Sequence, residues 1–180
     1  CEYEREGMNM SGVSYDRVTK TFHWFMAIII VYTTMAGYGM HLTTQDSPMF
    51  HFLSTLNMSL ATVAAPVFLA RWVWKYFRPS LEVDDNIAHW QKSIAKLIHS
   101  LMYFMMSWVF ISGFLMLQSP YYFFWIVEIS NLIQEVEISS FFFQVHRLSC
   151  LMLASLVMLH ILAVAHHHLI RKHNVLKLML

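Results

Sequence analysis

Long apolar runs dominate the chain, and four of them are long enough to cross a lipid bilayer. A transmembrane helix needs about 20 mostly apolar residues. The stretches that reach this length are 22–41, 50–74, 94–117 and 144–168. The pattern therefore predicts an all-α protein of a single domain over residues 1–180, built as an integral membrane four-helix bundle.

Short polar segments before the second and third runs are typical of helix starts. Asp46 or Ser47 can cap the second helix, and Pro48 suits a first helical turn. Asp84, Asp85 and Asn86, grouped at 84–86, suit a start of the third helix well before its apolar run.

The connection 118–143 is long for a loop in a helix bundle. Aromatic clusters flank "IVEISNLIQEVEISS", in which apolar residues recur at helical spacing; these are Ile126, Ile129, Ile133 and Val136. We expect an amphipathic helix between the third and fourth spans, lying in the outer membrane interface and held there by an aromatic belt.

Composition agrees with the membrane prediction. The chain is 57% hydrophobic and only 13% charged, whereas soluble domains contain roughly 25% charged residues. We therefore expect membrane lipid around the bundle and no nucleic-acid partner.

Eleven of the twelve lysine and arginine residues fall on one side of the predicted membrane. They are Arg5, Arg17, Lys20, Arg71, Lys75, Arg78, Lys92, Lys96, Arg171, Lys172 and Lys177. The opposite loops carry only Arg147 among basic residues. Because basic loops stay on the inner side, both termini should face the cytoplasm or the mitochondrial matrix.

The chain has eleven histidines, and most lie in the spans or at their ends. They include His23, His41, His51, His99, His146, His160 and the run His166–His168. Polar side chains at membrane depth are costly and usually functional. A single one is equally well explained as a hydrogen bond between helices.

His146 and His160 stand out because they form a spaced pair. Fourteen residues of helix end about 40° short of four full turns, so both rings share one face, about 21 Å apart. One metal ion cannot use both ligands, but two haems stacked across the membrane could each use one. His23 starts the first span at the depth of His160 and could complete the inner site, with Lys20 beside it to pair with a propionate.

These features resemble the bacterial cytochrome b561 family over nearly the whole chain. The motifs are "KTFHWFM", "RWVWKYFRP", "IAKLIHSLMYF" and "VHRLSCLMLASLVMLHILAVAHHHLIRKHNVL". The resemblance implies haem b held by His23, His146 and His160, with His99, His167 and His168 near a quinone or the propionates. It also implies an energy-transducing inner membrane, bacterial or mitochondrial.

One expected ligand is missing from the second span. The family's second helix supplies a histidine for the outer haem fourteen residues before the basic exit, and this chain has Asn57 there. Three outcomes stay open: the outer haem is lost, His51 or His41 replaces the ligand, or another group such as Met58 ligates. One or two haems are therefore expected.

Two functions follow. The first is a membrane b-type cytochrome that transfers electrons to or from quinone in a respiratory chain, which would make it a quinone-linked oxidoreductase. The alternative is an accessory haem-binding subunit with one degenerate site, associated with other respiratory subunits or with a second copy of itself. An ion transporter is disfavoured because no Asp or Glu lies inside any span.

Overall fold

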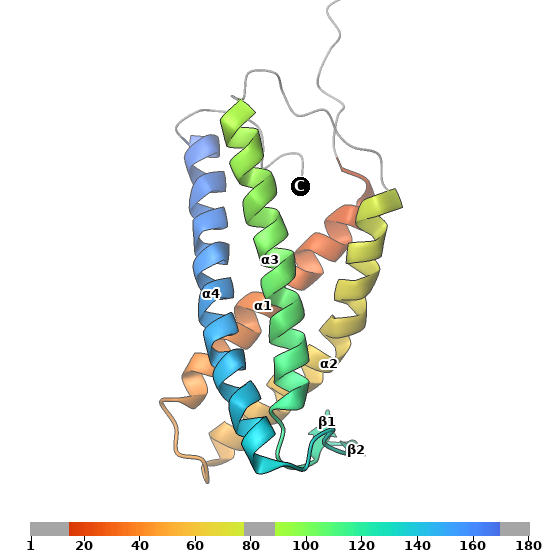
Figure 1. Ribbon diagram of the computed structural model, residues 1–180, viewed down its shortest axis with the longest axis vertical. Coiled ribbons are helices and arrows are strands. Elements are labelled where there is room, and N and C mark those ends of the chain that lie inside the picture. Colours follow the sequence, from red (N-terminus) through yellow and green to blue (C-terminus); the bar gives the residue numbers. More distant parts are fainter. Residues whose placement is uncertain (1–14, 78–88, 170–180) are drawn as a thin grey trace, which may run out of the picture.

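A computed structural model describes residues 15–77 and 89–169, with the side chain of His167 also outside the described part. Along the chain the elements are α1 (Arg17–Met40), α2 (Pro48–Phe77), α3 (His89–Leu115), β1 (Tyr121–Phe123), β2 (Val127–Ile129) and α4 (Val136–Leu169) (Figure 1). All four helices are long and apolar enough to cross a membrane. The predicted all-α membrane bundle is confirmed.

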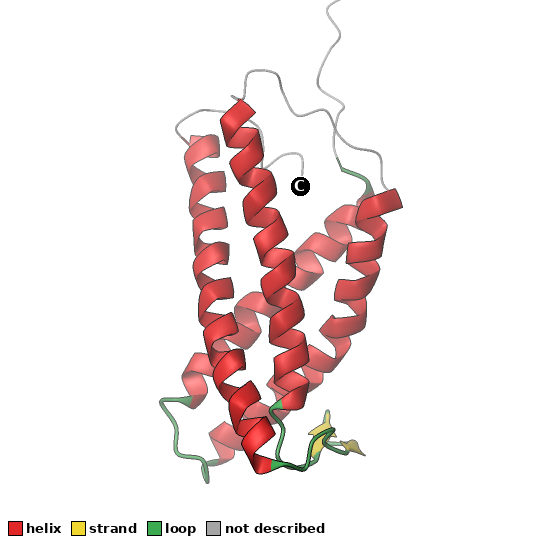
Figure 2. Cartoon of the chain, viewed as in Figure 1, coloured by secondary structure: helices red, strands yellow, loops and turns green. Residues whose placement is uncertain are grey.

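The helices form two pairs (Figure 2). In one pair α1 packs along α2, and in the other α3 packs along α4. The start of α1, the end of α2, the start of α3 and the end of α4 lie toward one end of the bundle. We call this the inner end, because its flanking residues are basic, and the opposite end the outer end.

Side-chain caps define the starts of the first two helices. The Asp16 carboxylate accepts a hydrogen bond from the Thr19 backbone N–H at 3.0 Å, and Ser47 Oγ accepts one from Phe50 N–H at 3.1 Å. The predicted Ser47 cap and the first-turn Pro48 are thus confirmed. The acidic segment 84–86 lies outside the described residues.

A second interaction ties α1 to α2 near the inner end. The Trp74 indole N–H donates to Thr19 Oγ1 at 3.1 Å, and the Thr19 hydroxyl in turn donates to Asp16. The hydrogen bond from Thr19 holds the pKa of Asp16 below its ordinary value. This chain of contacts fixes where α1 begins relative to the last turns of α2.

The predicted interfacial helix between the third and fourth spans is wrong. The segment forms a small antiparallel hairpin in which Tyr121 pairs with Ile129 and Phe123 with Val127, followed by an early start of α4 at Val136. Aromatic and β-branched residues favour strands as well as fitting a helical spacing. The spacing of four apolar residues could not distinguish the two structures.

Contacts with α2 stabilise the hairpin. The Tyr121 and Thr62 hydroxyls are 2.8 Å apart, and Ser59 Oγ accepts a hydrogen bond from Phe124 N–H at 2.8 Å. Phe124 and Trp125 have positive φ angles of 45° and 63°, which bulky side chains rarely adopt. The Trp125 ring stacks on Phe52 with centroids 5.5 Å apart, so tertiary contacts compensate for the strained turn.

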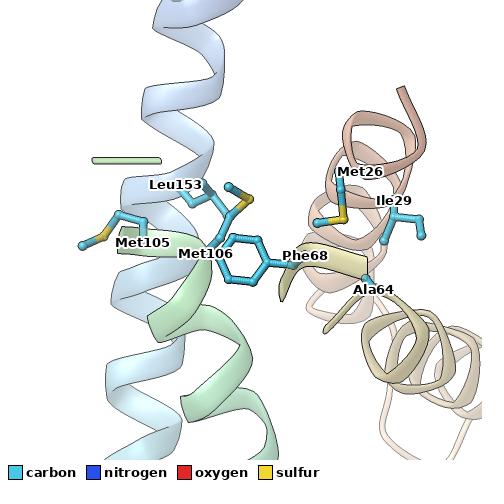
Figure 3. Close-up of a cluster of buried hydrophobic side chains, with 7 residues drawn as sticks. All are labelled: Met26, Ile29, Ala64, Phe68, Met105, Met106 and Leu153. Carbon is cyan, nitrogen blue, oxygen red and sulfur yellow. The ribbon is translucent and has the colours of Figure 1, made fainter. Parts of the chain in front are cut away.

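Phe68 joins the two helix pairs at the middle of the bundle. Its side chain is 3% exposed, and its ring lies 5.9 Å from that of Tyr103 and 5.5 Å from that of Phe110, both on α3. Phe68 belongs to a cluster of buried side chains, which comprises Met26, Ile29, Ala64, Phe68, Met105, Met106 and Leu153 (Figure 3). Figure 3 shows the Phe68 ring reaching from α2 toward Met106 and Leu153.

We predict that Phe68→Ala destabilises the bundle. The change removes the ring that fills the space between the pairs, and large-to-small core substitutions of Phe cost about 3–5 kcal/mol. Unfolding in detergent micelles, followed by circular dichroism, should show a clearly lower midpoint.

Leu69→Ala is the matched control, because Leu69 is the next residue on α2 and its side chain is 55% exposed. It should shift the midpoint little. Equal shifts for the two variants would mean that Phe68 is no special contact between the pairs.

Candidate functional site

Each of the four helices contributes one side chain to a cluster at the inner end. Arg71 Nη2 on α2 lies 3.1 Å from His23 Nδ1 on α1. The rings of His99 on α3 and His160 on α4 are 5.1 Å apart between centroids. His23 also interacts electrostatically with His160 and His99. The structure therefore brings together the two residues predicted as inner ligands, His23 and His160, with His99 beside them.

Arg71 is the member of this cluster that sequence reasoning counted only as a positive charge. Its guanidinium also lies over the Tyr103 ring, 5.8 Å from the centroid, in a cation–π arrangement. The sequence contained an indication that Arg71 is more than a flanking charge, since Arg71 falls inside an apolar span rather than beyond its end. A cation at that position must find a partner within the bundle.

The Arg71–His23 hydrogen bond restricts how His23 can bind iron. A guanidinium only donates hydrogen bonds, so His23 Nδ1 accepts here and Nε2 carries the ring proton. Ligation through Nε2 requires the opposite tautomer, with the proton on Nδ1. Arg71 must then find another acceptor, and a propionate is the acceptor that a haem brings with it.

Two further residues predicted at the inner end, Lys20 and His168, lie on α1 and α4. Lys20 is half-buried on α1, one turn before His23, and His168 is half-buried near the end of α4. The side chain of His167 lies outside the described part of the structure. The roles of Lys20, His99, His167 and His168 near a quinone or a propionate stay predictions.

His146 is firmly oriented at the outer end. Its Nδ1 lies 3.1 Å from the Val109 carbonyl oxygen and 3.3 Å from Ser112 Oγ. A carbonyl only accepts, so Nδ1 carries the proton and Nε2 is left with its lone pair, 3.4 Å from Cys150 Sγ. Histidine ligands of metals typically donate their second N–H to a carbonyl in this way.

Gly113 makes room for this imidazole. A Cβ atom at Gly113 would lie 3.2 Å from His146 Cε1 and 3.4 Å from Nδ1. The glycine allows α3 to approach the ring closely. His146 is thus the specific partner of Gly113.

The other residues considered for the outer site lie elsewhere. His41 is exposed and caps the end of α1. His51 and Met58 line a pocket of about 270 Å³ between α2 and the β1 segment, and His146 is not among the described residues lining it. Met58 is 8% exposed. Their roles as replacement ligands stay predictions.

Asn57 carries an unpaired atom. Among the described residues, Asn57 Oδ1 is the buried side-chain oxygen or nitrogen without a hydrogen-bond partner. Leaving a buried acceptor unsatisfied costs about 1–3 kcal/mol. Asn57 also stands where the resemblance to the family implies a histidine ligand.

Among residues 15–77 and 89–169, no group of three or more His, Cys, Asp or Glu could hold a metal ion alone. A haem needs only one or two axial side chains, because the porphyrin supplies the other iron ligands. The paired imidazoles at the inner end and the oriented His146 at the outer end fit this requirement. Fold and site together therefore define an integral membrane protein of the haem-binding class.

Comparison with known families agrees with this class. Residues 14–180 match the family model of prokaryotic cytochrome b561, and the chain belongs to that family. Membership implies haem b and electron transfer within the membrane. No curated protein matches the sequence.

We predict that Gly113→Ala disturbs His146. Alanine normally stabilises a helix interior by about 0.5–1 kcal/mol relative to glycine, but here the added methyl group would press against a ring held by Val109 and Ser112. Purified protein should show a lower unfolding midpoint and an altered haem absorption band.

Gly37→Ala provides the control, since a Cβ at Gly37 would have no atom within 4 Å in the described part of the chain, apart from its own helix backbone and its chain neighbours. It should leave the spectrum unchanged and be neutral or slightly stabilising. The close contact would lose its importance if both variants behaved like the parent protein.

Proposed function

We propose that this cytochrome transfers electrons between a membrane quinone and a second redox partner in an energy-transducing membrane, with its inner end toward the bacterial cytoplasm. The observation that carries the proposal is the convergence of His23, Arg71, His99 and His160 from four different helices. Bringing costly polar groups together at membrane depth is expected where they bind a cofactor.

In this proposal His23 and His160 would hold the inner haem through their imidazoles, and the haem would supply the one-electron chemistry when bound. Arg71 pairs with a propionate, and Lys20 offers a second positive charge one turn before His23. The chain orients the imidazoles and excludes water from between the helices.

Quinone chemistry also needs protons. The His99 side chain is exposed, and its ring is 5.1 Å from that of His160. Imidazole titrates near neutral pH and can hold or release a proton at a ring nitrogen. His99 and His168 are therefore suited to exchange protons between the inner aqueous phase and a quinone bound near the cluster.

The pairing of His23 with His160 is tested by His23→Ala and His160→Ala. Each should abolish the low-spin signal of the inner haem, because one imidazole cannot provide both axial ligands. Electron paramagnetic resonance and absorption spectra of the purified variants give the measurement. His89→Ala, which removes an exposed histidine at the start of α3, should keep the signal; an unchanged low-spin spectrum in either of the other variants contradicts the pairing.

Arg71→Gln should lower the midpoint potential of the inner haem by roughly 60 mV, which is a tenfold change in its one-electron reduction equilibrium. The reason is that a nearby positive charge favours the reduced iron. A spectroelectrochemical titration measures the potential.

Lys75→Gln is the matched control. It removes the same charge from the same helix, and Lys75 Nζ also lies over the Tyr103 ring at 4.9 Å. A comparable shift in both variants would indicate a general effect of charge rather than a specific role of Arg71.

A second candidate function is an accessory haem subunit of a larger respiratory complex or of a homodimer. Asn57 in place of an expected ligand supports it. A chain that lacks the outer haem could not pass electrons from one haem to the other across the membrane. Reduction of the purified protein by a short-chain quinol separates the two: rapid reduction supports the electron-transfer function, and its absence together with co-purified subunits supports the accessory one.

A further inference from the structure

The two ends of the bundle differ in the side chains that their helices provide. At the inner end, imidazoles from α1, α3 and α4 lie near one another. At the outer end, α4 provides His146, whereas α2 provides the carboxamide of Asn57. This difference suggests that the two ends bind their cofactors differently.

Helical geometry places Asn57 on the side of α2 that faces the other pair. It lies seven residues before Ala64, which in a regular helix returns to within about 20° of the same direction, and this interval does not cross Pro66. Ala64 is buried in the same cluster as Phe68. Phe68 points toward α3 and α4 (Figure 3). Ser59 and Thr62, in contrast, contact the hairpin on another side of α2.

The same reasoning places His146 on the facing side of α4. It lies seven residues before Leu153, again within about 20° of the same direction, and Leu153 belongs to the cluster around Phe68. Asn57 and His146 are therefore on the facing sides of α2 and α4, both outward of the Phe68 layer.

Two observations indicate that this space receives a ligand. His146 is held through Nδ1 by the Val109 carbonyl, and its Nε2 faces the Cys150 thiol at 3.4 Å, a weak donor that an iron atom would displace. Asn57 Oδ1 is buried without a hydrogen-bond partner among the described residues. His51 and Met58 line the pocket beside the hairpin instead, and His41 is exposed.

We propose that the outer end binds a haem through His146 alone, and that Asn57 lies on its opposite side as a hydrogen-bonding residue rather than a ligand. A neutral carboxamide is a poor partner for haem iron, which prefers imidazole or sulfur ligands. The outer site would then accept a small exogenous ligand such as cyanide. The Asn57 carboxamide, whose Oδ1 has no partner among the described residues to hold it in one orientation, can turn about its Cβ–Cγ bond and donate from its N–H₂ to that ligand. The inference rests on the proposed haem function and extends it to a second, open site.

The test uses the purified full-length protein, its haem content, and absorption and electron paramagnetic resonance spectra with and without cyanide. Wild type should carry two haems per chain, one low-spin and one high-spin, and cyanide should convert only the high-spin one. His146→Ala should lose the high-spin haem and cyanide binding while keeping the low-spin signal.

Substitutions at Asn57 test its part directly. Asn57→His should convert the high-spin haem to low-spin and abolish cyanide binding without changing haem content. Asn57→Ala should keep the high-spin signal but raise the dissociation constant of cyanide about tenfold, the usual effect of one lost hydrogen bond.

The outcomes separate this inference from the proposed function. A single low-spin haem without cyanide binding overturns the open outer site and leaves the inner site intact. Two low-spin haems also overturn it, and loss of one in His51→Ala or His41→Ala would identify the replacement ligand. Absence of any low-spin haem would overturn the proposed function itself. Wild type alone decides these cases, even if Asn57→His fails to fold.

Discussion

The packing of Phe68 against α3 is the contact on which the arrangement of the histidines depends. Lipid tails are as apolar as helix surfaces, so helices in a bilayer associate by close packing and hydrogen bonds rather than by a hydrophobic effect between them. The described contacts hold α1 to α2 and α3 to α4 along their lengths, and the Phe68 cluster joins these pairs. It also divides the interior into an inner and an outer end.

The imidazoles at the two ends have different kinds of hydrogen-bond partner. At the inner end the partner of His23 is the long, charged side chain of Arg71, which can exchange one acceptor for another. At the outer end the partner of His146 is the backbone carbonyl of Val109, which cannot move away, and Gly113 lets the ring approach it. The outer imidazole is thus oriented before any ligand arrives, whereas the inner one must change its hydrogen bonding.

Prediction from sequence succeeded for long apolar runs and for residues that mark a helix start, because both are properties of a single segment. Four apolar runs became four helices, and Ser47 and Pro48 marked the start of α2. It failed over 118–143, where Ile126 and Ile129 belong to a hairpin, Ile133 lies in the connection after it, and Val136 begins α4. The hairpin is specified by its partners on α2, Ser59 and Thr62, and these contacts join residues about sixty positions apart.

The chain alone was enough to predict the membrane class, the spans, the distribution of charge and the shared face of His146 and His160, because these follow from the length and period of single helices. Three features came only with the packed bundle: Arg71 meets His23, His99 lies beside His160, and the buried Asn57 Oδ1 has no hydrogen-bond partner among the described residues. Such neighbours depend on how far each helix is rotated about its own axis and where it crosses the others, and both are set by side-chain packing between helices rather than by any pattern within one.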